Sequence, residues 1–226
     1  MPKVSFVMPT RNRLEWIGES ISSNLAQTVE DIELVIVNDA SDDGTKEFLD
    51  EWAAKFSRVK IIHNEQRMGG GRSRNIGMQA ASSDIIATCD DDDLSCDTRA
   101  ELIIKHFDLN PKSELVTFPY VSIGYCNEKL EEFDGEPFDH EGFLNGGNTY
   151  FSNPSSAVRK SSALELGGYE PETDDETDDI QFLRKWVKAG KKVDFQPGYF
   201  VNFHRVLPNS MMVKHRGWDP NWLKPK

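Results

Sequence analysis

The first half of the chain alternates short apolar runs with longer segments in which apolar residues recur at helical spacing. The apolar runs predict buried strands at 4–8, 32–37, 59–63 and 85–88. The segments between them predict helices at 14–26, 44–56 and 71–80. Strands that alternate with helices in this way are typical of a doubly wound α/β sheet with parallel strands.

This alternation stops after Pro111. The elements expected beyond it are a strand at 115–125, irregular chain at 135–153, a helix at 178–189 ended by Gly190, and strands at 192–195 and 199–203. From Arg205 on there is no periodicity, so a mobile loop or tail is expected. We therefore expect one α/β domain with two halves, 1–110 and 111–204, followed by a mobile tail at 205–226.

Polar segments follow three of the predicted strands, at 9–13, 38–44 and 90–93. In doubly wound sheets, ligands bind beyond the carboxyl ends of the strands, which is where these segments fall. Within the second segment, Asp42, Asp43 and Gly44 are better explained as a turn and a helix cap than as ligand contacts.

The third segment is a run of four aspartates, Asp90 to Asp93, which concentrates negative charge at one strand end. Carboxylates about 4 Å apart repel each other by about 4 kcal/mol at an effective dielectric constant of about 20, so the run is expected to take up protons or a metal ion. Oxygen ligands of this kind suit Mg²⁺, Mn²⁺ or Ca²⁺. Alternatively, Asp93 caps a helix that begins near Leu94 while its neighbours are solvated. The run by itself supports both interpretations equally.

Composition limits the class of partner. The chain has 226 residues, with 26 Lys plus Arg against 38 Asp plus Glu and a net charge of −12, which opposes binding to duplex nucleic acid or to an anionic bilayer. The N-terminal apolar run is too short for a signal peptide, and no segment approaches the roughly 20 apolar residues of a transmembrane helix. The cysteines, Cys89, Cys96 and Cys126, lack metal-site spacing and are expected to be reduced thiols. A cytosolic location is expected, and peripheral contact with a membrane stays open.

A glycine run at 69–71 allows the backbone to approach a ligand closely, and Arg74 follows it in the next predicted helix. A diphosphate could therefore contact helix N–H groups and this guanidinium. The chain contains no Gly-x-x-x-x-Gly-Lys-Ser/Thr sequence, which excludes a P-loop. In the turn at 9–13, either Arg11 or Arg13 is expected near phosphate; the alternative is that both arginines solvate the start of a helix.

Four segments, taken in order, carry a resemblance to a known family. They are Val-Met-Pro-Thr-Arg-Asn-Arg at 7–13, Ile-Val-Asn-Asp-Ala-Ser-Asp-Asp-Gly-Thr at 36–45, Asn-Glu-Gln-Arg-Met-Gly-Gly-Gly-Arg-Ser-Arg-Asn-Ile-Gly at 64–77 and Cys-Asp-Asp-Asp-Asp at 89–93. Together they resemble the family 2 glycosyltransferases of GT-A fold, and the similarity continues through 167–169 and 177–184. The resemblance implies a single GT-A domain, a Rossmann-like doubly wound mixed sheet flanked by helices. In it, 1–110 binds the nucleotide sugar and 111–204 faces the acceptor.

The resemblance also assigns roles to individual residues. Asp39 matches the carboxylate that accepts a hydrogen bond from uracil, and Asp92 matches the direct ligand of a divalent cation, Mn²⁺ or Mg²⁺. Asp90 would contact the ribose or reach the metal through water, and Asp93 would support both. His204 is either a third metal ligand or an ordinary strand-end histidine. The expected nucleotide-sugar site consists of Pro9, Thr10, Arg11, Arg13, Asp39, Gly70, Arg74, Asp90 and Asp91.

In this family the catalytic base is an acidic residue at the start of a helix, in a Glu-Asp pair followed by an apolar stretch and an Arg. The match here is Asp178, with Thr177 in place of the usual Glu and Arg184 in register. A carboxylate there can take the proton of an acceptor hydroxyl as its oxygen attacks the anomeric carbon opposite the leaving group, which inverts that carbon. Glu176 and Asp179 are alternative bases. It is also possible to explain these acidic residues as a stabilised first helical turn.

The resemblance implies a metal-dependent, inverting glycosyltransferase of the hexosyltransferase type, which uses a nucleotide-diphosphate sugar, with UDP favoured, and an unidentified hydroxyl acceptor. The rival hypothesis is a non-catalytic module on the same scaffold that binds a sugar nucleotide or a divalent cation. Acceptor choice is expected to lie at 124–150. The basic residues 214–216, beside Trp218 and Trp222, either close on the diphosphate or the acceptor, or belong to a solvated tail.

Overall fold

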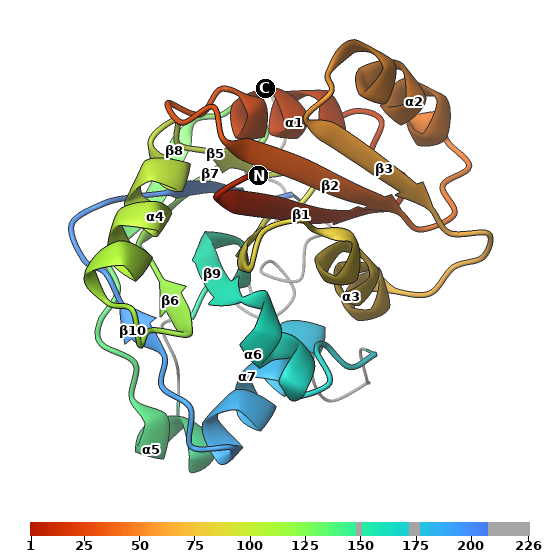
Figure 1. Ribbon diagram of the computed structural model, residues 1–226. Helices are drawn as coiled ribbons and strands as arrows, with labels where there is room; N and C mark the ends of the chain where they lie inside the picture. The colour runs from red at the N-terminus through yellow and green to blue at the C-terminus, as the bar shows by residue number, and fades with distance from the viewer. Residues whose placement is uncertain (148–150, 172–176, 208–226) are drawn as a thin grey trace.

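The computed structural model describes residues 1–147, 151–171 and 177–207. Within these residues the chain forms a seven-stranded and a four-stranded sheet with helices around them (Figure 1). The helices are α1 Ile17–Leu25, α2 Thr45–Lys55, α3 Gly70–Ala80, α4 Arg99–Leu109, α5 His140–Leu144, α6 Lys160–Glu165 and α7 Asp178–Lys188, with a 3-10 turn, η1, at Asn153–Ser155.

The larger sheet has the strand order β10-β6-β9-β4-β1-β2-β3. Its strands are β1 Val4–Thr10, β2 Ile32–Asn38, β3 Val59–His63, β4 Ile85–Thr88, β6 Leu115–Thr117, β9 Ser156–Arg159 and β10 Asp194–Phe195. Strand β1 pairs in parallel with β2 and β4, and β2 pairs in parallel with β3. Strand β9 runs antiparallel to both of its neighbours, β4 and β6. The sheet is therefore mixed, as the family resemblance implied.

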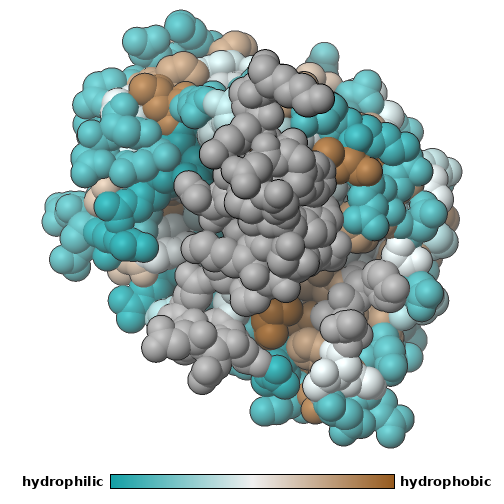
Figure 2. Space-filling view, turned by 180° about the vertical axis from the view of Figure 1, so that it is seen from behind, coloured by the Kyte–Doolittle hydropathy of each residue, from teal (hydrophilic) through white to brown (hydrophobic). Residues whose placement is uncertain are grey.

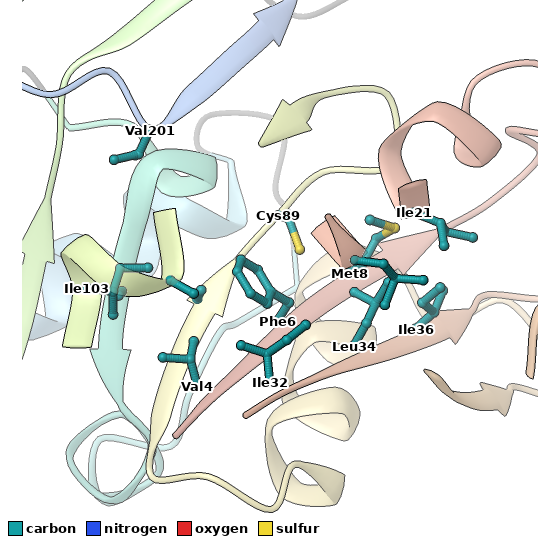
Figure 3. Close-up of a cluster of buried hydrophobic side chains, with 14 of the residues drawn as sticks. Val4, Phe6, Met8, Ile21, Ile32, Leu34, Ile36, Cys89, Ile103 and Val201 are labelled. Atoms are coloured by element: carbon teal, nitrogen blue, oxygen red, sulfur yellow. The ribbon is translucent and has the colours of Figure 1, made fainter. Parts of the chain in front are cut away.

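Both faces of this sheet are buried, which explains the nearly continuous apolar runs of its strands. On one face, Val4, Phe6 and Met8 of β1 pack with residues of α1, α2 and α4 (Figure 3). On the other face, Val7 packs with residues of α3, α6 and α7. Figure 1 shows α1 and α2 on one side of β1, β2 and β3, and α3 on the other. The layers hold the strand ends in register, with Thr10 opposite Asn38.

The smaller sheet has the order β5-β11-β7-β8, and its strands are β5 Leu94–Ser95, β7 Tyr120–Ile123, β8 Lys129–Phe133 and β11 Asn202–Arg205. Strand β11 pairs in parallel with β7 and antiparallel with β5. Because β5 follows directly after the aspartate run, this pairing brings His204 and Arg205 beside the aspartates. The smaller sheet thus places residues of β11 next to the end of β4.

Some elements differ from the sequence-based expectations. The expected strand at 115–125 is two strands, β6 and β7, in different sheets, and Pro119 lies between them, where it has no N–H to continue a ladder. The helix expected from Leu94 begins at Arg99, because 94–95 form β5. The strand expected at 199–203 is β11, at Asn202–Arg205.

Five elements of the described second half were not expected: β8, β9, α5, α6 and the 3-10 turn η1. Strand β9 lies inside the larger sheet, yet its sequence, Ser-Ala-Val-Arg, contains no apolar run. Helix α5 lies in the segment expected to be irregular, where Asp139 caps it by accepting a hydrogen bond from the N–H of Gly142 at 2.9 Å. Short elements such as these depend on their partners more than on their own periodicity.

None of the described helices is long and apolar enough to cross a membrane. Among the described residues visible in Figure 2, hydrophilic ones predominate and the apolar ones lie in small separate groups. All three cysteines are unpaired, and burial raises the pKa of the Cys89 thiol to about 12. Most of the expected tail, including 214–216, Trp218 and Trp222, lies outside the described residues.

Candidate active site

The carboxyl ends of β1, β2 and β4 and the start of α3 surround a cavity of about 340 Å³, which we call the nucleotide cavity. It lies at the edge where doubly wound sheets bind ligands. It is lined by every residue expected at the nucleotide sugar and the metal: Pro9, Thr10, Arg11, Arg13, Asp39, Gly70, Arg74, Asp90, Asp91, Asp92 and His204. Arg205, which the sequence analysis did not select, also lines it. The fold therefore brings these residues together in one place.

Asp39 holds the loop between β3 and α3. Its carboxylate accepts hydrogen bonds from Nδ2 of Asn64 at 2.8 Å and from the N–H groups of Met68 and Gly69 at 2.7 and 2.8 Å. Burial by itself would raise the pKa of Asp39, but these hydrogen bonds outweigh burial and the pKa lies below its ordinary value. The carboxylate is therefore ionised at neutral pH. A carboxylate has about four lone-pair sites, and the hydrogen bonds to this loop use most of them.

The residues after Asp39 form the expected turn and helix cap. Asp43 accepts a hydrogen bond from the N–H of Thr45 at 3.0 Å and from the N–H of Leu14 at 3.2 Å. Gly44 precedes α2 with a φ of +97°, a conformation that favours glycine. The turn therefore joins the end of β2 to the segment after β1.

The glycine run brings the start of α3 close to the second half of the chain. Gly69 has a φ of +89°, which favours glycine. A Cβ atom on Gly71 would lie 2.4 Å from the backbone oxygen of Glu170, so a larger residue would push these two segments apart. Gly70 lines the nucleotide cavity, where the unpaired N–H groups of a first helical turn can bind an anion.

Three of the four aspartates face the nucleotide cavity. Asp90 accepts a hydrogen bond from Arg74 at 2.9 Å, and Asp91 lies 3.4 Å from Nε of Arg13. Burial raises the pKa of Asp91 to about 6, although Arg13 opposes this shift. Burial and the neighbouring aspartates raise the pKa of Asp92 well above its ordinary value. Asp91 and Asp92 are therefore the carboxylates of this cavity at which a bound proton or cation is favoured most.

Asp93, the fourth aspartate, is buried beneath the other three. It accepts hydrogen bonds from Nδ2 of Asn202 at 2.7 Å and from the N–H of Arg205 at 2.8 Å, and it contacts Nδ1 of His204 at 3.1 Å. Burial would raise the pKa of Asp93, but the His204 charge and these hydrogen bonds lower it. Asp93 caps no helix, because α4 begins only at Arg99. The alternative interpretation of Asp93 as a helix cap is therefore wrong.

His204 lies between Asp93 and the nucleotide cavity, with 19% of its side chain exposed. Burial would lower the pKa of His204, but Asp93 outweighs burial and raises it to about 9. Because Nδ1 contacts Asp93, Nε2 is the nitrogen left for a ligand, and carboxylate–histidine pairs of this kind often orient metal-binding histidines. Within 1–147, 151–171 and 177–207, however, no group of three His, Cys, Asp or Glu side chains is arranged to hold a metal ion.

Asp178, the expected base, is the first residue of α7 and forms an ion pair with Arg74. Arg74 also contacts Asp90 at 2.9 Å, and its guanidinium lies 5.6 Å from the ring centre of Tyr169. Burial would lower the pKa of Arg74, but the two carboxylates outweigh burial and raise it. The structure thus joins Arg74 and Asp178, to which the sequence analysis assigned separate roles.

A second cavity, of about 290 Å³, adjoins the nucleotide cavity and shares Arg74, Asp90 and His204 with it. We call it the sugar-side cavity. Asp178 and Asp179 both line it, and Asp179 accepts a hydrogen bond from the hydroxyl of Thr177. Glu176, the other alternative base, lies outside the described residues.

Among the residues that line these cavities, Asn153, Tyr120 and Arg205 were not selected by the sequence analysis. Arg205 fell in the expected tail, although its place directly after His204 could have drawn attention to it. Asn153 fell in a segment expected to be irregular. Tyr120 was inside a predicted strand whose partner was unknown. In each case the strand pairing, rather than a local pattern, brings the residue to the site.

A family model described as "Glycosyl transferase family 2" matches residues 5–167. Over 109 residues the chain is 36% identical to an uncharacterized glycosyltransferase of Haemophilus influenzae, a match that covers 48% of this chain and 34% of that protein. Over 91 residues it is 31% identical to glycosyltransferase GlyG of Streptococcus pneumoniae, covering 40% of this chain and 30% of that protein. The matches thus span about a third of the length of these two relatives.

Solved structures share the fold. TarS of S. aureus in complex with UDP-GlcNAc matches with a TM-score of 0.76 and 19% identity, over 93% of this chain and 60% of that chain. The mannosyltransferase PcManGT from Pyrobaculum calidifontis, in complex with GDP-Man and Mn²⁺, matches with a TM-score of 0.68 and 20% identity, over 95% of this chain and 60% of that chain. At these identities the likeness concerns the fold alone.

Proposed function

Because the chain belongs to glycosyl transferase family 2 and has the GT-A fold, we propose that it is a metal-dependent, inverting glycosyltransferase of the hexosyltransferase type. It moves a sugar from a nucleotide-diphosphate sugar, with UDP favoured, to an acceptor hydroxyl. One observation carries the proposal: Arg74 contacts both Asp90 in the nucleotide cavity and Asp178 in the sugar-side cavity. A diphosphate group and a general base can therefore act within the reach of one side chain.

The donor nucleotide binds along the ends of β1 and β2. The turn at Pro9 and Thr10 lies along the nucleotide, and the Asp39 carboxylate, which lines the same cavity, accepts the imide N–H of uracil. Arg11 and Arg13 are the cations of this turn, and Gly70 and Arg74 contact the diphosphate through the N–H groups of α3 and the guanidinium. Complexes of TarS with UDP-GlcNAc and UDP support this class of donor.

Asp92 and His204 would hold the divalent cation, with Asp90 and Asp91 beside it. The donor set fits such an ion, because burial and the neighbouring carboxylates raise the pKa of Asp92, so that a cation beside this carboxylate would stabilise its ionised form. Substrate phosphates usually supply part of the coordination of Mg²⁺, so the protein need not provide a complete ligand set. When bound, Mn²⁺ or Mg²⁺ supplies Lewis-acid stabilisation of the departing diphosphate.

Asp178 is the general base. It takes the proton of the acceptor hydroxyl as the hydroxyl oxygen attacks the anomeric carbon from the face opposite the diphosphate, and the configuration inverts. In the unliganded protein Arg74 occupies this carboxylate. A diphosphate competes for the same guanidinium, so donor binding is expected to free Asp178 for the acceptor.

Acceptor choice is assigned to 124–150, of which the described part holds β8 and α5. The three unpaired thiols favour a reducing, cytosolic location.

Calorimetric titration tests the donor site. UDP and a panel of UDP-, GDP- and dTDP-sugars are titrated with and without Mn²⁺ into the wild-type protein and Asp92→Ala, with Asp134→Ala as an exposed control. Metal-dependent binding of one nucleotide is expected, lost in Asp92→Ala and kept in the control. Absence of nucleotide binding under both conditions would refute the transferase proposal.

Turnover separates a transferase from a non-catalytic binding module. Release of nucleotide from the bound donor is measured for Asp178→Asn and Asp179→Asn beside the control Asp108→Asn, an exposed residue outside both cavities. Loss of the base is expected to slow Asp178→Asn by about 10²–10⁴-fold while nucleotide affinity is kept. If Asp179→Asn loses more turnover than Asp178→Asn, Asp179 is the base. If the wild-type protein shows no turnover with any class of acceptor, the non-catalytic binding module is favoured.

A further inference from the structure

The sugar-side cavity contains one polar group that neither the fold nor the proposed reaction uses. Asn153, in η1, is 2% exposed and lines this cavity. Its side-chain Nδ2 has no hydrogen-bond partner among the residues that the structure describes. Buried polar groups are nearly always paired, and an unpaired donor costs free energy. A ligand that accepts a hydrogen bond from Nδ2 would remove that cost.

The Asn153 amide is held in one orientation. Its Oδ1 accepts a hydrogen bond from the hydroxyl of Tyr169 at 2.8 Å, so the amino group faces away from that ring. The backbone oxygen of Asn153 accepts from the hydroxyl of Ser156 at 2.7 Å and from that of Thr88. The donor is thus fixed before any ligand arrives, which reduces the entropy lost on binding.

Tyr169 is itself rigid. Its backbone N–H and C=O both bond to the side-chain amide of Asn75, at 2.8 Å each, and its ring stacks on Phe182 with 4.5 Å between the ring centres. Asn75 belongs to α3 and Phe182 to α7. The helices that carry Arg74 and Asp178 therefore also orient the Asn153 amide, through Tyr169.

The other residues that line the sugar-side cavity indicate which chemical group fits it. Carboxylates of Asp90, Asp178 and Asp179 accept hydrogen bonds, while Phe151 and Pro154 offer apolar surface. Asn153 adds an uncharged buried donor to these acceptors. A sugar ring presents hydroxyls that both donate and accept, and apolar C–H faces. The volume of about 290 Å³ lies at the lower end of the range of about 300–1,000 Å³ for ligand pockets, as one ring requires.

We propose that Asn153 is a specificity-determining residue for the transferred sugar, whose Nδ2 donates a hydrogen bond to a ring hydroxyl or acyl oxygen of the donor. The donor sugar is favoured over the acceptor because the two cavities share Arg74, Asp90 and His204. A sugar attached to a diphosphate at Arg74 extends directly into the sugar-side cavity. This inference rests on the proposed function, since it needs a nucleotide-sugar donor.

The discriminating variant is Asn153→Asp. It keeps the shape of the side chain and an acceptor for the Tyr169 hydroxyl, so the fold is expected to persist, but it replaces the free donor by an acceptor. A second variant, Tyr169→Phe, keeps the amide and removes the hydroxyl that orients it. The matched controls are Asn110→Asp and Tyr199→Phe, both exposed residues that line neither cavity.

Affinities are measured calorimetrically with Mn²⁺ for UDP, UDP-glucose, UDP-galactose, UDP-N-acetylglucosamine, GDP and GDP-mannose. In the wild type one nucleotide sugar is expected to bind more tightly than its parent nucleotide. In Asn153→Asp the ratio of nucleotide-sugar affinity to parent-nucleotide affinity is expected to fall about tenfold, which is the effect of losing one hydrogen bond. The affinity for the parent nucleotide itself should stay within about twofold of the wild-type value. Tyr169→Phe is expected to lower the same affinity ratio.

The two levels of failure are distinguishable. If the wild type binds neither UDP nor GDP, the proposed function fails. If it binds a nucleotide but Asn153→Asp keeps the wild-type ratio of sugar to nucleotide affinity, the inference about Asn153 is overturned and the transferase proposal stands. Melting temperatures of all variants are recorded first, so that a loss of ratio is scored only in folded protein.

Discussion

Arg74 connects the two halves of the proposed reaction through a single side chain. Its guanidinium contacts Asp178 and Asp90, residues of α7 and of the aspartate run, and lies over the ring of Tyr169. Buried ion pairs gain little net stability, because desolvation offsets the attraction. Under the proposed function, the arrangement has a consequence for the ligand: an incoming diphosphate would meet a cation that is already desolvated and in place.

Replacing Asp39 by asparagine tests whether this carboxylate stabilises the fold when no ligand is bound. In Asp39→Asn, the new amino group faces N–H donors of the loop, and a lost buried partner of this kind costs about 1–3 kcal/mol. The variant should therefore lower the free energy of unfolding by that amount at pH 7, without ligand. Urea unfolding measures it, with the exposed Asp134→Asn as control.

The pH dependence of this difference follows from the pKa of Asp39. The folded pKa lies below the unfolded value of about 3.9, so the folded state favours the ionised carboxylate. The contribution is fully present above the unfolded pKa and is lost as pH falls through the lower folded pKa. The difference in the free energy of unfolding between the wild type and Asp39→Asn should therefore shrink below about pH 4. A gap that widens on acidification would contradict the assignment.

At the scale of elements, the packing of α3 on the sheet fixes where the glycine-rich turn meets the nucleotide cavity. Gly77 of α3 faces β1 and β2, and a Cβ atom there would lie 2.5 Å from Cγ1 of Val7 and 3.3 Å from Cγ2 of Val37. Val7 is fully buried in the sheet, so it has no room to move. The close approach therefore depends on glycine at this position.

Gly77→Ala is expected to destabilise the protein. Overpacking of a buried site costs about 1–3 kcal/mol, which exceeds the gain of up to about 1 kcal/mol from replacing a helical glycine by alanine. Gly18→Ala is the matched control, because the added Cβ would meet the ring of the half-buried Phe48 at 3.2 Å, a side chain that can yield. Thermal unfolding of both variants measures the difference, and Gly77→Ala is expected to have the lower melting temperature. Equal melting temperatures would mean that α3 can shift away from β1.

At the scale of the whole molecule, Arg205 joins segments from both sheets. Its Nε donates to the backbone oxygen of Asp92 at 2.8 Å, and Nη1 donates to the backbone oxygen of Tyr125 at 3.1 Å. Its Nη2 pairs with Glu19 of α1 at 2.8 Å, and the guanidinium lies 4.6 Å from the ring centre of Trp16. One buried side chain thus links β11, the turn that follows β7, α1 and the aspartate run.

Arg205→Met should lower the free energy of unfolding by about 3 kcal/mol, because it leaves two partly buried carbonyl groups without their donor and breaks an ion pair whose arginine is buried. Glu19→Gln, which changes only the half-exposed partner, should cost less than about 1 kcal/mol. Urea unfolding followed by tryptophan fluorescence measures both. If the two variants lose equal stability, the ion pair with Glu19, and not the carbonyl contacts, is what Arg205 contributes.

The amino-acid sequence by itself determined the alternation of strands and helices in the first half and the position of its polar segments. Both follow from local physics. A strand buried on two faces needs an apolar residue at nearly every position, and a helix between two such strands needs apolar residues at helical spacing. The segments that follow parallel strands then meet at one edge. Residues as distant as Pro9, Asp39 and Asp90 could therefore be predicted to share a site, and they line one cavity.

Only the tertiary structure decided the second half and the contacts that close the site. Strand β9 enters the sheet in antiparallel orientation with a sequence that has no strand pattern. The contact between Arg74 and Asp178 joins residues 104 positions apart, and Asn153 and Arg205 are buried by elements to which they are not adjacent in sequence. Periodicity reports which face of an element is covered; what covers it depends on the packing of distant segments, because burial is non-directional and does not by itself select a partner.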